Sequence, residues 1–261
     1  MFAHGFSNQT VAITGGESGI GRATAILFSK AGATVLINDV ILQSVNDELF
    51  AELGIERLIG DARLEQTHQD LADRAIEKTG RLDVYVNNAG VVLVKPVTEI
   101  TEEDWEFCMG VNLKGVFFGC KQAIRHMLKT GGGSIVNVAS NAGLLPRAHD
   151  PLYSSSKQAV VGMTKSLALC HSKDRIRINA VCPGPVSETG IMDDDIERAE
   201  DPEQFQQAVI GASPGAAAWG RMMTPDEVAE SIAWLSSDAA VMVTGTMIAI
   251  DGGKSLGVPP T

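Results

Sequence analysis

One stretch near the start of the sequence decides the fold: VAITGGESGIG, residues 11–21. Its first four residues are apolar or β-branched and predict a buried strand, and the glycines that follow permit a tight turn. From Gly21 to Lys30 the apolar residues recur at helical spacing, so a helix is expected directly after the turn. Backbone N–H groups at such a helix start can approach a pyrophosphate, and the helix dipole favours negative charge there. We therefore predict a phosphate-binding turn, although its spacing is G-x-x-x-G-x-G and not G-x-G-x-x-G.

The same alternation of strand and helix continues along the chain. Short apolar runs predict further strands at 34–37, 84–86, 134–138, 176–181 and 247–250. Amphipathic segments predict helices at 64–79, 103–128 and 153–170, and the run Thr224-Pro-Asp-Glu227 predicts a capping box that opens a late helix. Nearly continuous apolar strands suit a parallel sheet covered by helices on both faces. The sequence thus predicts a single-domain α/β chain over residues 1–261 with a Rossmann-type doubly wound sheet.

One segment, residues 188–220, departs from this pattern. It is acidic at 193–195, rich in Ala, Gly and Pro at 211–220, and without a clear strand period. We predict that it forms a mobile lid over the substrate, ordered by a ligand.

Composition limits the classes of partner and compartment. The chain has 261 residues with 21 Lys+Arg against 32 Asp+Glu, and this net charge of -11 disfavours nucleic acids and anionic membranes as partners. No apolar run approaches the roughly 18 residues of a membrane-spanning helix, and Met1–Asn8 lacks the features of a secretory signal. The four cysteines are spread widely, without zinc spacing, so we predict no metal site and a cytoplasmic location. They are Cys108, Cys120, Cys170 and Cys182.

An acidic residue at the end of the second predicted strand indicates which dinucleotide is bound. Asp39 follows the last glycine of the turn by 39 − 21 = 18 residues. A carboxylate at about this spacing accepts hydrogen bonds from the adenosine ribose and repels a 2′-phosphate. Glu17, an acid within the turn, points the same way, so the sequence predicts NAD and not NADP.

A tyrosine and a lysine four residues apart supply the candidate chemistry. Tyr153 and Lys157 share one face of the predicted helix. A cation about 4 Å from a phenol, at an effective dielectric near 20, contributes about 4 kcal/mol, which corresponds to roughly three pKa units. Such a phenol exchanges protons near neutral pH, as the interconversion of an alcohol and a carbonyl requires. Taken alone, the pair fits an ordinary surface helix better than a catalytic one.

Polar residues after two other predicted strands strengthen the catalytic interpretation. Ser140 stands at the carboxyl end of the strand at 134–138, where ligands bind in open parallel sheets. The run Asn87-Asn88-Ala89-Gly90 follows another strand with small residues. Asn112 is an amide within an apolar helical pattern, and a structural role is the simpler interpretation of this residue alone.

These residues, in this order, resemble the short-chain dehydrogenase/reductase family. The matching motifs are the glycine-rich turn, Asn87–Gly90, Asn112, Ser140, Tyr153-x-x-x-Lys157, Pro183-Gly184 and Asp251-Gly-Gly253, which together span nearly the whole chain. The resemblance implies seven parallel strands, a nicotinamide cofactor and a homotetramer. It also implies that Tyr153 is the general acid/base, Lys157 lowers its pKa and holds the nicotinamide ribose, Ser140 orients the substrate oxygen, and Asn112 anchors a water of the proton relay.

The resemblance further implies a set of cofactor contacts. In addition to Tyr153 and Lys157, they are Gly15, Ser18, Gly19, Ile20, Asp39, Asp61, Ala62, Asn88, Ala89, Val186 and Thr189. One position departs from the family, because Glu188 stands where the pattern Pro-Gly-x-Val-x-Thr has its threonine. Thr189 then either returns to the cofactor phosphate through a local insertion or merely begins the segment at 188–220.

The leading hypothesis is an NAD-dependent oxidoreductase that transfers a hydride between NAD(H) and a small secondary alcohol or ketone. A reductase of 3-oxoacyl thioesters that uses NADPH shares every motif, and a basic patch at Arg125, Lys129, Lys173 and Arg175 is a candidate docking site for its acidic carrier protein. A non-catalytic dinucleotide sensor on the same fold is the alternative from another class. Arg147 and His149 lie in a segment predicted to line the pocket, where Arg147 is either a solvated loop residue or the partner of a substrate carboxylate.

Overall fold

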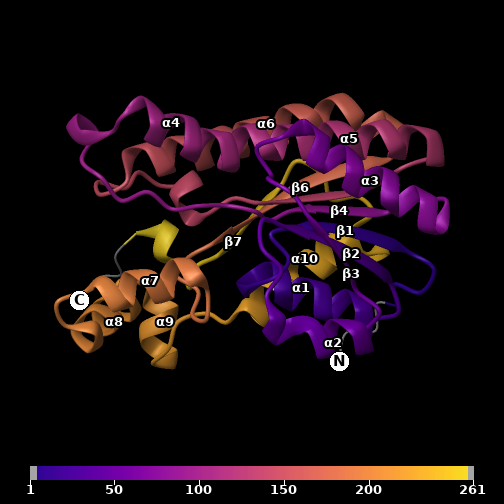
Figure 1. The fold of residues 1–261 in the computed structure, drawn as a ribbon. Coiled ribbons are helices and arrows are strands. Elements are labelled where there is room, and N and C mark those ends of the chain that lie inside the picture. The colour runs from indigo at the N-terminus through magenta and orange to yellow at the C-terminus, as the bar shows by residue number, and fades with distance from the viewer. Residues whose placement is uncertain (1–4, 258–261) are drawn as a thin grey trace.

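A sheet of seven parallel strands forms the middle layer of the structure (Figure 1), in the order β3-β2-β1-β4-β5-β6-β7. The computed structural model describes residues 5–257, without the side chains of Ile191, Asp194 and Asp195. Part of the expectation for Met1–Asn8 and part of the acidic run at 193–195 lie outside the described residues. The strands are β1 (Thr10–Thr14), β2 (Thr34–Asp39), β3 (Glu56–Ile59), β4 (Val84–Asn87), β5 (Gly133–Val138), β6 (Ile176–Pro183) and β7 (Met247–Ile250).

Helices cover both faces of the sheet. On one face lie α3 (Glu65–Thr79), α4 (Glu102–Met109), α5 (Val116–Thr130) and α6 (Pro151–His171), and on the other α1 (Gly19–Lys30), α2 (Asp47–Glu52) and α10 (Pro225–Ser236). Each face has its own buried apolar cluster, because the strands carry aliphatic side chains on both sides. The predicted fold class, a doubly wound sheet of seven parallel strands, is confirmed.

At the edge of the sheet beside β2, the sequence analysis missed one strand and one helix. The missed strand, β3, has the sequence Glu-Arg-Leu-Ile at the edge of the sheet and is only half-buried, so it lacks the apolar run that marked the other six. The missed helix, α2, has six residues, too few for a helical period to show. Both belong to the edge of the sheet beside β2, where fewer side chains need to be apolar.

The helix predicted at 103–128 is a continuous helical run with a change of winding. Between α4 and α5, residues Gly110–Gly115 form a π-helical segment. Gly115 lies against the backbone of Ala62, whose carbonyl oxygen would be 2.5 Å from an added Cβ. The π-helical segment therefore brings the helix backbone directly onto the loop that follows β3.

The segment at 188–220 contains regular structure that the sequence analysis did not predict. It forms α7 (Gly190–Arg198), α8 (Pro202–Gly211) and α9 (Pro214–Trp219). The start signals are visible in retrospect, because Thr189 and Asp201 cap α7 and α8 with their side chains, and prolines occupy the first turns of α8 and α9. The predicted capping box at Thr224 is confirmed at the start of α10.

The strand order places a crevice at one edge of the sheet. β1 lies between β2 and β4, so the chain leaves the carboxyl ends of β1 and β4 toward opposite faces. Ligands of open parallel sheets bind at such a switch point. The glycine-rich turn after β1 and the asparagines after β4 meet there.

Candidate active site

The glycine-rich turn is held by the end of the neighbouring strand. The Asn88 Nδ2 donates to the carbonyl oxygens of Thr14 at 3.0 Å and of Gly15 at 2.7 Å. In return, the Thr14 Oγ1 accepts from the backbone N–H groups of Asn88 and Ala89, each at 3.1 Å. Gly15 adopts φ +66°, and a Cβ at Gly21 would overlap the Gly15 carbonyl oxygen. Glycine is thus required at both positions by conformation and by space.

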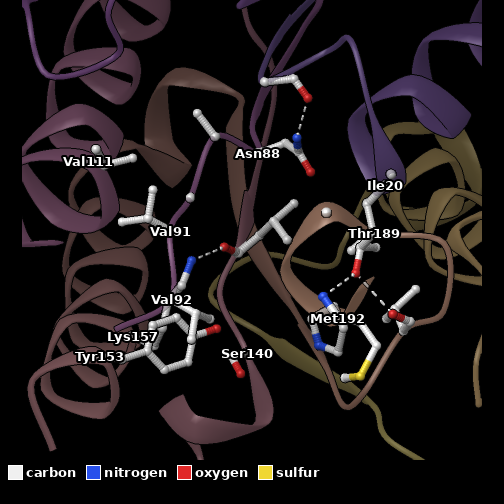
Figure 2. A pocket seen from close by; sticks show the side chains of 18 of the residues that line it. Ile20, Asn88, Val91, Val92, Val111, Ser140, Tyr153, Lys157, Thr189 and Met192 are labelled. Atoms are coloured by element: carbon white, nitrogen blue, oxygen red, sulfur yellow. Dashed lines mark hydrogen bonds between the residues drawn. The ribbon is translucent and has the colours of Figure 1, made fainter. Parts of the chain in front are cut away.

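A cavity of about 680 Å³ opens beside this turn at the carboxyl edge of the sheet (Figure 2). With one exception, every residue that the sequence analysis assigned to catalysis or cofactor binding lines it. These residues are Gly15, Ser18, Gly19, Ile20, Asp39, Asp61, Ala62, Asn88, Ala89, Ser140, Tyr153, Lys157, Val186 and Thr189. The exception is Asn112.

The Asn112 side chain is fully buried and bonded to its protein neighbours. Its Oδ1 accepts from the Val91 N–H at 2.9 Å, and its Nδ2 donates to the Val91 carbonyl at 2.9 Å and to the Ser156 Oγ at 3.1 Å. The side chain therefore joins the π-helical segment to the backbone after β4 and to α6. A role of Asn112 in a proton relay stays a prediction.

The Ser140, Tyr153 and Lys157 side chains meet at one end of the cavity (Figure 2). Ser140 follows β5, whereas the other two lie in the first turns of α6. The Lys157 Nζ donates to the Val138 carbonyl at 3.0 Å and lies 5.8 Å from the centroid of the Tyr153 ring. All three side chains are buried, with exposed fractions of 7% or less.

Burial dominates the proton affinities of this group. Burial raises the pKa of Tyr153, while the hydrogen bond from Ser140 and the positive charge of Arg147 lower it. Burial also lowers the pKa of Lys157, to about 8. Lys157 was expected to bring the Tyr153 pKa down, but the groups that oppose the effect of burial in this structure are Ser140 and Arg147.

The side chain of Asp39 lines the cavity beside the glycine-rich turn, and its contact with an adenosine ribose stays a prediction. Its Oδ2 accepts from the Glu17 N–H at 3.1 Å and its Oδ1 from the Val40 N–H at 2.8 Å. Glu17 itself is wrong as an indicator of cofactor choice. Its carboxylate is buried below the turn and accepts a hydrogen bond from the Arg57 Nε at 2.6 Å. The charge of Glu17 is therefore paired, and its side chain does not line the main cavity.

The position of Thr189 follows from an unusual backbone angle. Glu188, the extra residue relative to the family pattern, adopts φ +54°, which is uncommon for a residue other than glycine. The chain turns so that Thr189 lies against the glycine-rich turn, with its Cγ2 3.1 Å from a Cβ placed on Gly19. Thr189 also caps α7, and its Oγ1 donates to the Val186 carbonyl at 3.0 Å. Thr189 therefore begins the segment at 188–220, and its contact with a cofactor phosphate stays a prediction.

Several lining residues were not predicted as site residues. Phe205 and Val209 come from α8, and Lys254 comes from the short 3₁₀ helix Lys254–Leu256 after β7. Lys254 had a signal in the sequence, since it directly follows Asp251-Gly-Gly at the carboxyl end of a strand. Nothing local marks Phe205 or Val209, because the folding of α7 to α9 over the cavity brings them there.

Comparison with known proteins gives consistent matches over the whole chain. Residues 15–255 match the family model described as enoyl-(acyl carrier protein) reductase. The 3-oxoacyl-(acyl-carrier-protein) reductase FabG of Thermotoga maritima is 37% identical, over 92% of this chain and 95% of the relative. The meso-2,3-butanediol dehydrogenase of Serratia marcescens is 37% identical, over 96% of each chain. The crystal structure of levodione reductase superimposes with a TM-score of 0.89 at 30% identity, over 97% of this chain and 100% of that one.

The chain belongs to the short-chain dehydrogenase/reductase family. Members of this oxidoreductase family bind a nicotinamide dinucleotide. The cavity of this short-chain dehydrogenase/reductase fits such a group, because the Ser18 side chain makes no capping bond at the start of α1 and Gly19 and Ile20 line the cavity there. The first N–H groups of α1 are therefore available to a pyrophosphate.

Metal-ion clusters and membrane-spanning helices are both absent from the described residues. Over residues 5–257, no cluster of three or more His, Cys, Asp or Glu side chains is arranged to hold a metal ion. No helix in the same part of the chain has the length and hydropathy needed to span a membrane.

The burial of Lys157 gives a prediction for stability. In the unfolded chain the Lys157 ammonium group keeps its proton up to a pH near 10.5, but in the folded chain it releases this proton near pH 8. The Lys157 contribution to the free energy of unfolding therefore rises with pH between these two values. Lys157→Met removes the buried charge, and its stability advantage over the wild type should shrink by about 2 kcal/mol from pH 7.5 to 9.5. Urea denaturation of the cofactor-free protein measures this difference.

Lys165→Met, at an exposed lysine of the same helix, is the control. Its stability relative to the wild type should not follow pH in this way. A pH-independent difference for Lys157→Met would show that Lys157 keeps its ordinary proton affinity.

Proposed function

We propose that the protein is an NAD-dependent oxidoreductase that interconverts a small secondary alcohol and its ketone. The observation that supports this most is that Ser140, Tyr153 and Lys157 line the same cavity as the glycine-rich turn. A protein that only binds a dinucleotide has no need of a buried phenol, hydroxyl and ammonium group at the far end of its cavity. The arrangement therefore favours the enzyme over the sensor.

The reacting groups act on the substrate oxygen. Bound NAD supplies the acceptor of the hydride from the carbinol carbon. Ser140 donates a hydrogen bond to the substrate oxygen, and the Tyr153 hydroxyl exchanges the proton of that oxygen. Lys157, anchored on the Val138 carbonyl, places its ammonium group 5.8 Å from the centroid of the Tyr153 ring, and Ser140 and Arg147 lower the Tyr153 pKa.

Replacement of Tyr153 by Phe tests the catalytic assignment. Tyr153→Phe removes the proton-exchanging hydroxyl at nearly constant volume, so kcat should fall roughly 100- to 10,000-fold. NAD binding, followed by calorimetry, should remain close to that of the wild type. Near-normal turnover of an established alcohol substrate by this variant would contradict the role of Tyr153.

Asp39 supports NAD over NADP as the cofactor. Its carboxylate lies at the adenosine end of the cavity, where it would repel a 2′-phosphate. The neighbouring Arg57 does not offset this repulsion, because Glu17 and Asp47 already bind its guanidinium.

Replacement of Asp39 by Ser tests the choice of cofactor. The wild type should prefer NAD, and Asp39→Ser should raise kcat/KM for NADP relative to NAD at least about 30-fold, because a like-charge contact is removed. Asp61→Asn, the same loss of charge at the expected adenine site, should weaken both dinucleotides alike. Equal efficiency of the wild type with NAD and NADP would overturn the assignment.

Reduction of 3-oxoacyl thioesters with NADPH is the second candidate. The FabG relative favours it as much as the butanediol dehydrogenase favours the alcohol, since both are 37% identical. The position of the basic patch argues against it. Arg125 and Lys129 lie near the end of α5, and Lys173 and Arg175 precede β6, so the patch lies at the amino edge of the sheet, opposite the cavity. A carrier docked there would not deliver its acyl group to Tyr153.

Further proposals concern the organisation of the protein. The chain acts as a single domain, and residues 188–220 form its substrate lid, because Thr189, Met192, Phe205 and Val209 line the cavity. All four cysteines are free thiols, which supports a reducing cytoplasm.

Exposed Trp105, Phe117 and Leu169 on α4, α5 and α6 support a homotetramer that pairs these helices. Sedimentation equilibrium should give the mass of four chains, and a monomer would contradict this.

A further inference from the structure

Charge is distributed unevenly along the cavity. The acidic side chains that line it, Asp39 and Asp61, belong to the adenosine end, and the Asp61 carboxylate is paired with Arg63. Lys157 and Arg147 lie beside the Tyr153 ring, and a third cation of the lining, Lys254, lies near Arg147. This cluster stands out in a chain with 32 acidic and 21 basic residues. The catalytic hypothesis uses only Lys157.

Arg147 is fixed from behind and faces the reacting end. Its guanidinium carbon lies 5.8 Å from the centroid of the Tyr153 ring. Its Nη2 lies 2.9 Å from the Oδ2 of Asp150, which is fully buried. The other Asp150 oxygen accepts from the Ser154 Oγ at 2.9 Å, so the carboxylate cannot move freely. Asp150 thus positions Arg147 through one edge of the guanidinium and leaves its other donors to the cavity.

Lys254 adds a second cation from another element. Its side chain is half-buried and close enough to Arg147 that this charge, after burial, lowers the Lys254 pKa. No carboxylate among the described residues lies within ion-pair distance of the Lys254 Nζ. The nearby Asp251 is engaged elsewhere, because its oxygens accept from the N–H groups of Gly253 at 2.9 Å and Ser255 at 2.8 Å.

We propose that Arg147 and Lys254 bind a carboxylate of the substrate, so that the enzyme acts on short hydroxy acids and the corresponding keto acids. This inference rests on the proposed function. Lys254 is half-buried and has no ion-paired carboxylate among the described residues, so an anion beside it would be stabilising. Arg147, which is exposed and paired with Asp150, adds a second positive charge at the cavity. The planar guanidinium fits a carboxylate through two parallel hydrogen bonds, and the ammonium group adds a third donor. A carboxylate bound by Arg147 would lie beside Tyr153, so only a few bonds of the substrate would separate it from the hydroxyl carbon that reacts at Tyr153.

The reaction leaves the carboxylate unchanged. In the oxidative direction the carbinol C–H bond breaks and its electron pair passes with the hydrogen to NAD. The hydroxyl proton passes to Tyr153, and the carbinol carbon becomes a ketone. Arg147 and Lys254 hold the substrate before and after this step, so the removal of Lys254 should act mainly on KM. The removal of Arg147 should raise KM and also lower kcat, because its charge lowers the Tyr153 pKa.

A matched substrate series tests the inference. The purified enzyme with NAD is assayed on 2-, 3- and 4-hydroxypentanoate and on the three corresponding carboxamides, which have the same shape without the charge. At least one acid should exceed its amide in kcat/KM by about 10- to 100-fold, the range expected for charge-assisted hydrogen bonds. Raised salt should reduce this ratio.

Variants connect the preference to the two cations. Arg147→Met should raise KM for the acid about 10- to 100-fold, and Lys254→Met should do so to a smaller extent, while KM for the amide changes little. Any fall in kcat for Arg147→Met should be shared by acid and amide, because it acts through Tyr153. Lys173→Met removes the same charge at an exposed site outside the cavity and should leave the ratio unchanged. If Arg147→Met fails to fold because Asp150 is left unpaired, Arg147→Met with Asp150→Asn removes both charges and should give the same loss.

The outcomes separate this inference from the function on which it rests. Turnover of amides and acids with equal efficiency would overturn the carboxylate site and leave the alcohol dehydrogenase in place. Turnover restricted to hydroxyacyl coenzyme A thioesters would also overturn it, because the cations would then serve phosphates. If no alcohol of any class is oxidised, the proposed function itself fails.

Discussion

The amide of Asn88 and the hydroxyl of Thr14 join the ends of β4 and β1, and the site depends on this reciprocal contact. Asn88 donates to two carbonyl oxygens of the turn, and Thr14 accepts two N–H groups from the opposite strand end. The N–H groups of Gly15 and Gly16 also donate to the Asn38 carbonyl at the end of β2, so the turn is held between the ends of β2 and β4. The contact fixes one wall of the cavity to the loop that leads toward Asn112 and Ser156.

Burial then shapes the chemistry at the other end of the cavity. It moves the pKa of Tyr153 up and that of Lys157 down, so each group is held nearer its neutral form. A phenol in these surroundings needs nearby positive charge to lose its proton. Arg147 supplies part of this charge, and the proposed carboxylate site uses the same guanidinium. Substrate binding and proton transfer would in that case draw on one cation, which links specificity to reactivity.

The predictions from sequence succeeded where the signal was local or repeated. Six strands showed as apolar runs, the capping box at Thr224 as a fixed spacing, and the glycine-rich turn as a strand, turn and helix in succession. They failed at β3, where an edge strand can be half polar, and at α7 to α9, where Ala, Gly and Pro hide short capped helices. Glu17 misled because its partner, Arg57, is 40 residues away in the sequence.

By itself the sequence determined the doubly wound fold and the glycine-rich turn, and it named Ser140, Tyr153 and Lys157 as candidate site residues. Strand periodicity, turn chemistry and helix capping act between residues that are close in the chain, so they can be read without coordinates. Only the tertiary structure decided that Arg147 lies between Asp150 and Tyr153, that Lys254 joins it from the end of the sheet, and that Glu188 turns Thr189 back to Gly19. The physical reason is that charge, burial and close approach depend on distances in space, which the chain sets only when the whole sheet has formed.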